Sequence, residues 1–130
     1  MQLVEQGKID LSDPVARYVD DVPVEWRAVT IRQLFTHLSG LPDLWRDIDV
    51  IARNEAVAWT KVKAMPMLAQ PGERFRYTQT NYVLLAKVIS KVSGMPFNDF
   101  VIANQLAAVG MPRTMFAYSS NTPANSAGRY

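Results

Sequence analysis

The chain of 130 residues has the length of one domain or of a piece of a larger one, and its 48% hydrophobic and 20% charged residues are ordinary for a globular protein. A net charge of +2, from 14 basic and 12 acidic residues without a block of like charge, argues against nucleic-acid binding. The absence of cysteine excludes disulfides, thiol catalysis and cysteine-based metal sites.

The sequence contains no targeting signal that fixes a compartment. No apolar run reaches the ~18 residues of a membrane span. The first residues, Met1 to Gly7, lack the basic start and the long apolar region of a signal peptide. The compartment therefore stays open, because a chain without cysteine fits both oxidising and reducing surroundings.

The first residues predict short helices. Met1 to Gln6 is typical of a helix end, and Gly7 is a natural C-terminal stop. A helix of that length rarely stands alone, so we expect the chain to begin partway through an element. Ser12-Asp13-Pro14 is expected to open a short helix that runs to about Val19, with the Ser or Asp side chain as the cap.

A better-defined helix is predicted after Thr30, which is suited to capping. Apolar residues follow it at the period of a helix, namely Ile31, Leu34, Phe35 and Leu38. The sequence Ser39-Gly40-Leu41-Pro42 is expected to end this helix and to start a loop. From Asp43 to Lys63 the composition is helical but poorly periodic, which predicts one or two short helices.

The second half predicts two longer helices. Asn81 to Val92 is expected to form the first, and Pro96 to Val109 the second, ended by Gly94 and Gly110 respectively. The apolar stripe of the first comprises Tyr82, Leu85, Val88 or Ile89, and Val92. Glu73 to Arg76 is expected to be extended, and residues 117–130 are expected to form a surface loop. The fold class predicted for the chain as given is mainly α, with almost no strand.

The stretch from Pro71 to Tyr82 is the most informative part of the chain. It predicts a turn, an extended run and then an exposed Tyr77 at the mouth of a helix, where a tyrosine can act as a general base. A single tyrosine at a helix entry is more often an ordinary half-buried residue. The surrounding pattern, together with the stretch from Thr30 to Pro42, favours a site position instead.

These stretches resemble the serine β-lactamase-like hydrolases, which include class C β-lactamases, D-alanyl-D-alanine peptidases and family VIII-type esterases. The stretch from Gln2 to Leu11, followed by Asp13-Pro14, is similar to the end of the helix that bears that family's nucleophile. The resemblance covers nearly the whole chain in the right order. It implies that residues 1–130 are a partial β-lactamase-like domain, the helical subdomain, of a full fold that is α/β with an antiparallel sheet flanked by helices.

The resemblance also implies where the nucleophile belongs. The family's Ser-x-x-Lys pair would fall just before Met1, and no Ser-x-x-Lys occurs in these 130 residues. The family's third motif, Lys-Thr-Gly or His-x-Gly on a central strand, is also absent from them. Acyl transfer needs this serine and the backbone N–H groups that stabilise the oxyanion. We therefore expect the 130-residue chain alone to be inactive.

The implied site residues lie in the second motif and in the loop after Thr30. The family's Tyr-x-Asn reads Tyr77-Thr78-Gln79 here, which makes Tyr77 the base or proton relay and Gln79 an amide with a longer stem. A tyrosine ordinarily titrates near ~10, so such a base needs nearby positive charge. Trp45 and Leu41 are expected to contribute a substrate-facing wall.

Competing interpretations of the polar residues are weaker. His37 is the only histidine, and it is expected to be structural, because adjacent helical residues point apart and His37 cannot easily serve Ser39 as its base. A metal site is not expected around it. Asp43, Asp47 and Asp49 lack the glycine and the terminal glutamate of a calcium loop.

The expected partner is a β-lactam, a D-Ala-D-Ala peptide or a small ester, without a cofactor. A periplasmic or secreted location is what the family implies. The alternative is a non-catalytic helical domain that binds a ligand or partner in the same cleft, which Gln79 and the missing nucleophile favour slightly. An apolar face that the missing sheet would cover predicts a tendency to self-association.

Overall fold

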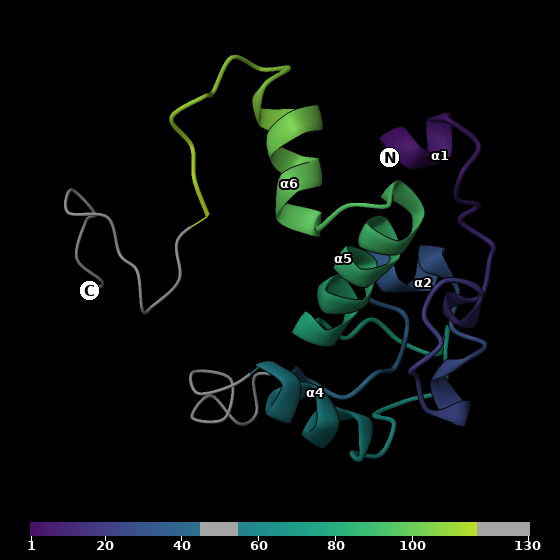
Figure 1. The fold of residues 1–130 in the computed structure, drawn as a ribbon. Helices are drawn as coiled ribbons and strands as arrows, with labels where there is room; N and C mark the ends of the chain where they lie inside the picture. Colours follow the sequence, from purple (N-terminus) through teal and green to yellow (C-terminus); the bar gives the residue numbers. More distant parts are fainter. Residues whose placement is uncertain (45–54, 117–130) are drawn as a thin grey trace.

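The longest helix, α5 (Gln79–Ser93), runs through the middle of the structure, with α2 (Ile31–Phe35) packed beside it and α6 (Phe97–Val101) following it (Figure 1). The computed structural model describes residues 1–44 and 55–116. The remaining helices are α1 (Gln2–Glu5), the 3-10 turns η1 (Val15–Arg17) and η2 (Val24–Trp26), α4 (Glu55–Lys63) and the π-helix η4 (Ile102–Leu106). Within the described ranges there is no strand, and one isolated bridge joins Pro14 to Thr30. The predicted mainly helical class is confirmed.

The core forms where α2, α5 and the segments around η1 and η2 meet. Its fully buried members include Trp26, Ile31, Leu34, Leu41 and Leu84. Trp26 and Trp59 pack edge to face with their ring centroids 5.9 Å apart, which attaches α4 to this core. Asp21, which lies between η1 and η2, accepts hydrogen bonds from Trp59 Nε1 and from Lys63 Nζ. Polar contacts therefore also attach α4 to this part of the chain.

The helix start predicted at Thr30 is confirmed, whereas the helix is shorter than predicted. The Thr30 hydroxyl accepts a hydrogen bond from the Gln33 amide, and the Gln33 side chain accepts one from the Thr30 amide. This capping box fixes the start of α2. The helix ends at Phe35, earlier than the apolar pattern through Leu38 predicts, because His37 adopts a left-handed φ of 56°.

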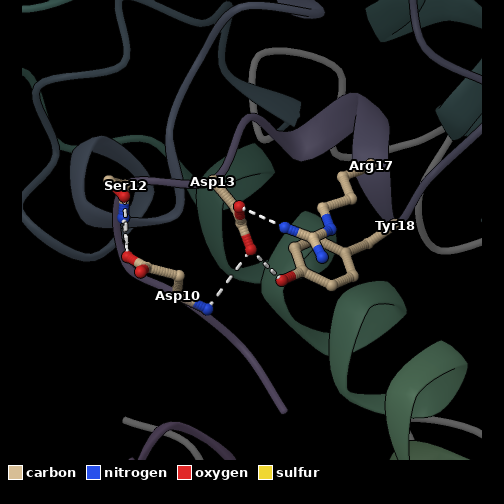
Figure 2. A network of polar contacts seen from close by, with 5 residues as sticks. All are labelled: Asp10, Ser12, Asp13, Arg17 and Tyr18. Atoms are coloured by element: carbon tan, nitrogen blue, oxygen red, sulfur yellow. Dashed lines mark hydrogen bonds and ion pairs between the residues drawn. The ribbon is translucent and has the colours of Figure 1, made fainter. Parts of the chain in front are cut away.

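The stop predicted at Gly94 is confirmed. The helical run before Gly110 already ends at Leu106, and the predicted cap before η1 is wrong. Gly94 ends α5 in the left-handed conformation, at φ 72°. The residue that precedes η1 as its cap is Pro14, and no side chain caps that turn. The Asp13 carboxylate binds Arg17 and the Tyr18 hydroxyl instead, and Asp10 binds Ser12 (Figure 2).

Two other expectations need correction. Tyr82 is 49% exposed and does not belong to the buried part of α5, which includes Leu84, Leu85 and Val88. The helix predicted from Pro96 to Val109 is α-helical only to Val101 and continues as η4. The extended backbone expected from Glu73 to Arg76 stays a prediction, and residues 74–78 have no regular secondary structure. The prediction of short helices from Asp43 to Lys63 is confirmed by α4 in the described part, and the loop predicted at 117–130 lies outside the described residues.

Candidate functional site

The candidate site forms where the segment after α2 runs along the segment before α5. Backbone hydrogen bonds join them, from Leu68 N to Gly40 O at 2.8 Å, from Gly72 N to Leu38 O at 2.7 Å and from Arg76 N to His37 O at 2.8 Å. These irregular segments thereby satisfy one another's backbone groups, as a strand ladder would. The arrangement places the start of α5 against the loop that begins at His37.

The side chains of Thr80 and Asp43 continue this connection at the start of α5. The Thr80 hydroxyl donates to Pro42 O at 2.6 Å and accepts from Leu44 N at 3.1 Å. The Gln79 amide donates to a carboxylate oxygen of Asp43 at 3.3 Å. A carboxylate at a helix N-terminus complements the helix dipole, so Asp43 also stabilises the first turn of α5.

A buried polar cluster of His37, Ser39 and Asn81 lies between the two segments. The Ser39 hydroxyl donates to Asn81 Oδ1 at 2.6 Å and accepts from the Leu41 amide at 3.2 Å. Asn81 Nδ2 lies 2.8 Å from His37 Nδ1. Since Asn81 Oδ1 is occupied as an acceptor, Nδ2 is the donor, and the imidazole is neutral with its proton on Nε2.

Burial also disfavours the charged form of this imidazole. His37 is 8% exposed, and removal from water lowers the pKa of its ring below the usual value of 6.5. Ser39 bonds to Asn81 rather than to the ring, so the predicted absence of a nucleophile–base pair between His37 and Ser39 is confirmed. The sequence analysis placed His37 as structural and did not use Asn81; their spacing across the chain gave no local signal that they would meet.

Tyr77 lies outside this cluster with its ring against it. The ring is 57% exposed, as predicted, and its centroid lies 4.5 Å from that of the His37 imidazole. The Tyr77 oxygen accepts a hydrogen bond from Gln79 Nε2 at 2.9 Å. The two residues predicted from the second motif therefore meet at the mouth of α5, with the phenol oxygen reachable from solvent.

Leu41 and Trp45 are the two residues predicted to form a substrate-facing wall. Leu41 is completely buried and contacts the core, which favours a packing role over contact with a substrate. Trp45 lies outside the described residues. Phe75 and Tyr82, which were not predicted as site residues, are 69% and 49% exposed, and their ring centroids lie 5.9 Å and 5.3 Å from that of the His37 imidazole.

Other candidate sites lie away from Tyr77. An apolar cavity of about 390 Å³ lies between α1, α5 and α6, and neither Tyr77 nor Gln79 lines it. Among residues 1–44 and 55–116, no group of His, Cys, Asp and Glu side chains is arranged to hold a metal ion. No helix in these ranges is long and apolar enough to cross a membrane.

The sequence matches relatives that are much longer than this chain. A penicillin-binding protein of Bacillus subtilis (strain 168) is 33% identical over 119 residues, which cover 86% of this chain and 26% of that protein. The chain thus spans about a quarter of the length of this curated relative.

Solved structures show the same fold. A penicillin-binding protein from Bacillus halodurans superposes with a TM-score of 0.78 at 31% identity, over 95% of this chain and 41% of its own. A D-amino acid amidase from Ochrobactrum anthropi SV3, solved in complex with L-phenylalanine amide, gives a TM-score of 0.74 at 26% identity, over 89% and 35%. The described helices therefore correspond to part of these larger structures.

The family model for beta-lactamases matches residues 1–130, the full extent of the sequence. This match agrees with the penicillin-binding and amidase relatives and with the helical fold described above. The chain belongs to the beta-lactamase family.

Proposed function

We propose that this chain is the helical part of a serine hydrolase that works by acyl transfer, and that Tyr77 is its general base or proton relay. The observation that carries the proposal is the position of the Tyr77 phenol, which is exposed at the mouth of α5 and bonded to Gln79. A general base must lie within hydrogen-bond reach of the proton it removes. An exposed phenol held by Gln79 is accessible to a serine supplied from outside these residues, which supports the proposal.

In the proposed reaction the serine oxygen attacks a carbonyl carbon while its proton passes to the tyrosine oxygen. The tyrosine returns this proton to the leaving group as the bond between the carbonyl carbon and the leaving group breaks, and an acyl-enzyme forms. Water, which gives up its proton to the same oxygen, then releases the acyl group as an acid, and the proton returns to the serine oxygen. Gln79 Nε2 donates to the Tyr77 oxygen, which stabilises negative charge there. The second N–H and the carbonyl of the Gln79 amide are left to bind a substrate amide.

The proposed substrates are β-lactams, D-Ala-D-Ala peptides and small esters or amides. The relatives include penicillin-binding proteins and an amidase bound to an amino acid amide, which supports this range. We also propose that the 130 residues alone do not catalyse the reaction, because they hold no Ser-x-x-Lys.

The test is intact mass after incubation with a reactive penicillin and, separately, with a fluorophosphonate. The 14.6 kDa chain is expected to gain no mass, and a longer polypeptide that joins these residues to a Ser-x-x-Lys segment is expected to gain one adduct. Replacing Tyr77 by Phe in that longer polypeptide should slow adduct formation by about 10²–10⁴-fold, the usual contribution of a general base. An unchanged rate in Tyr77→Phe would refute the proposed role.

Exposed apolar side chains favour self-association of the isolated chain as an additional proposal. Phe75, Val109 and Met115 are each more than 60% exposed, at 69%, 65% and 65%. Sedimentation of the 130-residue chain over a hundredfold concentration range should show a rising average mass. A constant monomer mass would contradict it.

A further inference from the structure

We propose that His37 is a positioning residue that fixes the ring of Tyr77, with Asn81 holding the imidazole in place. The catalytic consequence rests on the proposed function, whereas the geometric consequence does not. The cluster of His37, Ser39 and Asn81 is buried, polar and connected by hydrogen bonds, whereas Tyr77 itself lies in a segment without regular structure.

His37 touches Tyr77 and both of its neighbours in the chain. Its carbonyl oxygen accepts from the Arg76 amide at 2.8 Å, and its Nδ1 lies 3.5 Å from the Thr78 amide. Its ring lies against the Tyr77 ring with centroids 4.5 Å apart and planes tilted by 39°. One residue therefore restrains the backbone on each side of Tyr77 and the face of its ring.

The imidazole is itself held from the other side. Asn81 Nδ2 donates to Nδ1, and the amide cannot rotate because Ser39 Oγ donates to its oxygen. Asn81 and Ser39 are both completely buried, so breaking this chain would leave a polar group unpaired in the core. The ring of Tyr82 also stacks on the imidazole, with centroids 5.3 Å apart.

The backbone of His37 is left-handed, a conformation in which histidine, asparagine and aspartate are enriched. Its φ of 56° is the one positive value at a non-glycine residue among the described ranges. Such a conformation is disfavoured for most side chains and persists where the surroundings determine it. Asparagine adopts it more readily than other residues, which provides a useful substitution.

Two substitutions of His37 separate the role of its ring from the role of its hydrogen-bond acceptor. His37→Asn tolerates the backbone conformation and offers a side-chain oxygen to Asn81, but it removes the ring against Tyr77. His37→Phe keeps an aromatic ring and removes the acceptor. If the ring positions Tyr77, His37→Asn should disturb Tyr77 more than His37→Phe does.

The placement is measured by fluorine NMR of the full-length protein labelled with 3-fluorotyrosine. Tyr77→Phe identifies the Tyr77 resonance. We expect His37→Asn to shift and broaden that resonance, while the resonance of Tyr18, which bonds to Asp13 on another part of the fold, stays unchanged. A Tyr77 resonance that keeps its position in His37→Asn overturns the proposal.

The rate of acylation by penicillin tests the catalytic consequence in the same variants. A misplacement of the base on the order of 1 Å can lower a rate by about 10²-fold, so we expect a loss of that order in His37→Asn and a smaller one in His37→Phe. Val88→Ala, a core change in the same helix as Asn81 but outside the polar cluster, controls for general loss of stability and should leave the rate nearly unchanged.

The outcomes separate this inference from the proposed function. If Tyr77→Phe slows acylation but His37→Asn does not, the positioning role is wrong and the function stands. If Tyr77→Phe leaves the rate unchanged, the proposed function is wrong, and the fluorine resonance alone decides whether His37 places the Tyr77 ring. If Val88→Ala lowers the rate as much as His37→Asn does, the effect is one of stability and the positioning role is overturned.

Discussion

Gly40 and Ala69 approach so closely that a Cβ atom on Gly40 would lie 2.1 Å from the carbonyl oxygen of Ala69. Gly40 also has a φ of 71°, and its own carbonyl oxygen accepts from the Leu68 amide at 2.8 Å. This approach brings the loop after α2 against the segment that leads to Tyr77. Glycine is required here both by the backbone conformation and by the contact.

Gly40→Ala should therefore destabilise the protein strongly. Gly94→Ala is the matched control, because Gly94 has nearly the same φ, 72°, with no atom within 4 Å of an added Cβ. The control should lose about 1 kcal/mol from the left-handed conformation alone. Gly40→Ala should lose about 2 kcal/mol more, because the clash is with backbone that cannot move aside cheaply. Urea unfolding measures both, and equal losses would show that the close approach is absent.

Thr78 and Thr80 are a second matched pair. Both side chains are buried, but Thr80 Oγ1 bonds to Pro42 and Leu44, whereas Thr78 Oγ1 has no hydrogen-bond partner among the described residues. Thr80→Val should cost about 2 kcal/mol, and Thr78→Val should be neutral or stabilising by about 1 kcal/mol. Measuring the free energy of unfolding of each variant tests both expectations. A large loss in Thr78→Val would mean that this hydroxyl is bonded to a group beyond these residues.

The sequence predicted those parts of the fold that depend on local signals. Thr30 was predicted to cap the helix that begins at Ile31, and Gly94 was predicted to mark a helix end by its freedom to adopt a positive φ. The exposed position of Tyr77 followed from its place between a turn and a helix. These features depend on residues that are close in the chain.

The features that the sequence did not predict depend on distant residues. Asn81 contacts His37 and Ser39 from another part of the chain, so no local period marks it as part of the candidate site. Tyr82 has the spacing of an apolar stripe but stacks on His37 outside the core. The 3-10 turn after Pro14 lacks the predicted cap because Tyr18 and Arg17 take up the Asp13 carboxylate.

The contact between Tyr18 and Asp13 predicts acid sensitivity (Figure 2). The hydrogen bond from the Tyr18 hydroxyl, with smaller help from Arg17, lowers the pKa of Asp13 below its usual range. A carboxyl whose pKa is lowered by folding stabilises the folded state above its unfolded pKa, near ~3.9, and this stability is lost as the pH falls through the folded pKa.

Tyr18→Phe should bring the pKa of Asp13 back toward its usual value. The free energy of unfolding should then fall less steeply as the pH is lowered. Carbon-detected NMR titration of the Asp13 carboxyl measures the change. Asp21 is the internal control, since Lys63 and Trp59 lower its pKa and neither contact involves Tyr18. Movement of both carboxyls together would point to a general structural change and would contradict the local explanation.

His37 predicts a separate pH dependence at milder acidity. It is the sole histidine of the 130 residues, and burial lowers the pKa of its imidazole below 6.5. The unfolded chain then takes up a proton before the folded chain does, so stability is complete above about 6.5 and falls as the pH drops from there toward the folded pKa. Protonation would also turn Nδ1 into a donor facing Asn81 Nδ2, which is a donor too.

His37→Phe should remove this dependence, because no other histidine titrates in the chain. The free energy of unfolding, measured from pH 5 to pH 7.5, is expected to rise with pH in the unsubstituted protein and to be flat over the same range in His37→Phe. The variant should be less stable at the upper end, since Asn81 Nδ2 loses its acceptor. A slope that survives in His37→Phe would place the titrating group elsewhere and would remove the link between the neutral imidazole and the cluster beneath Tyr77.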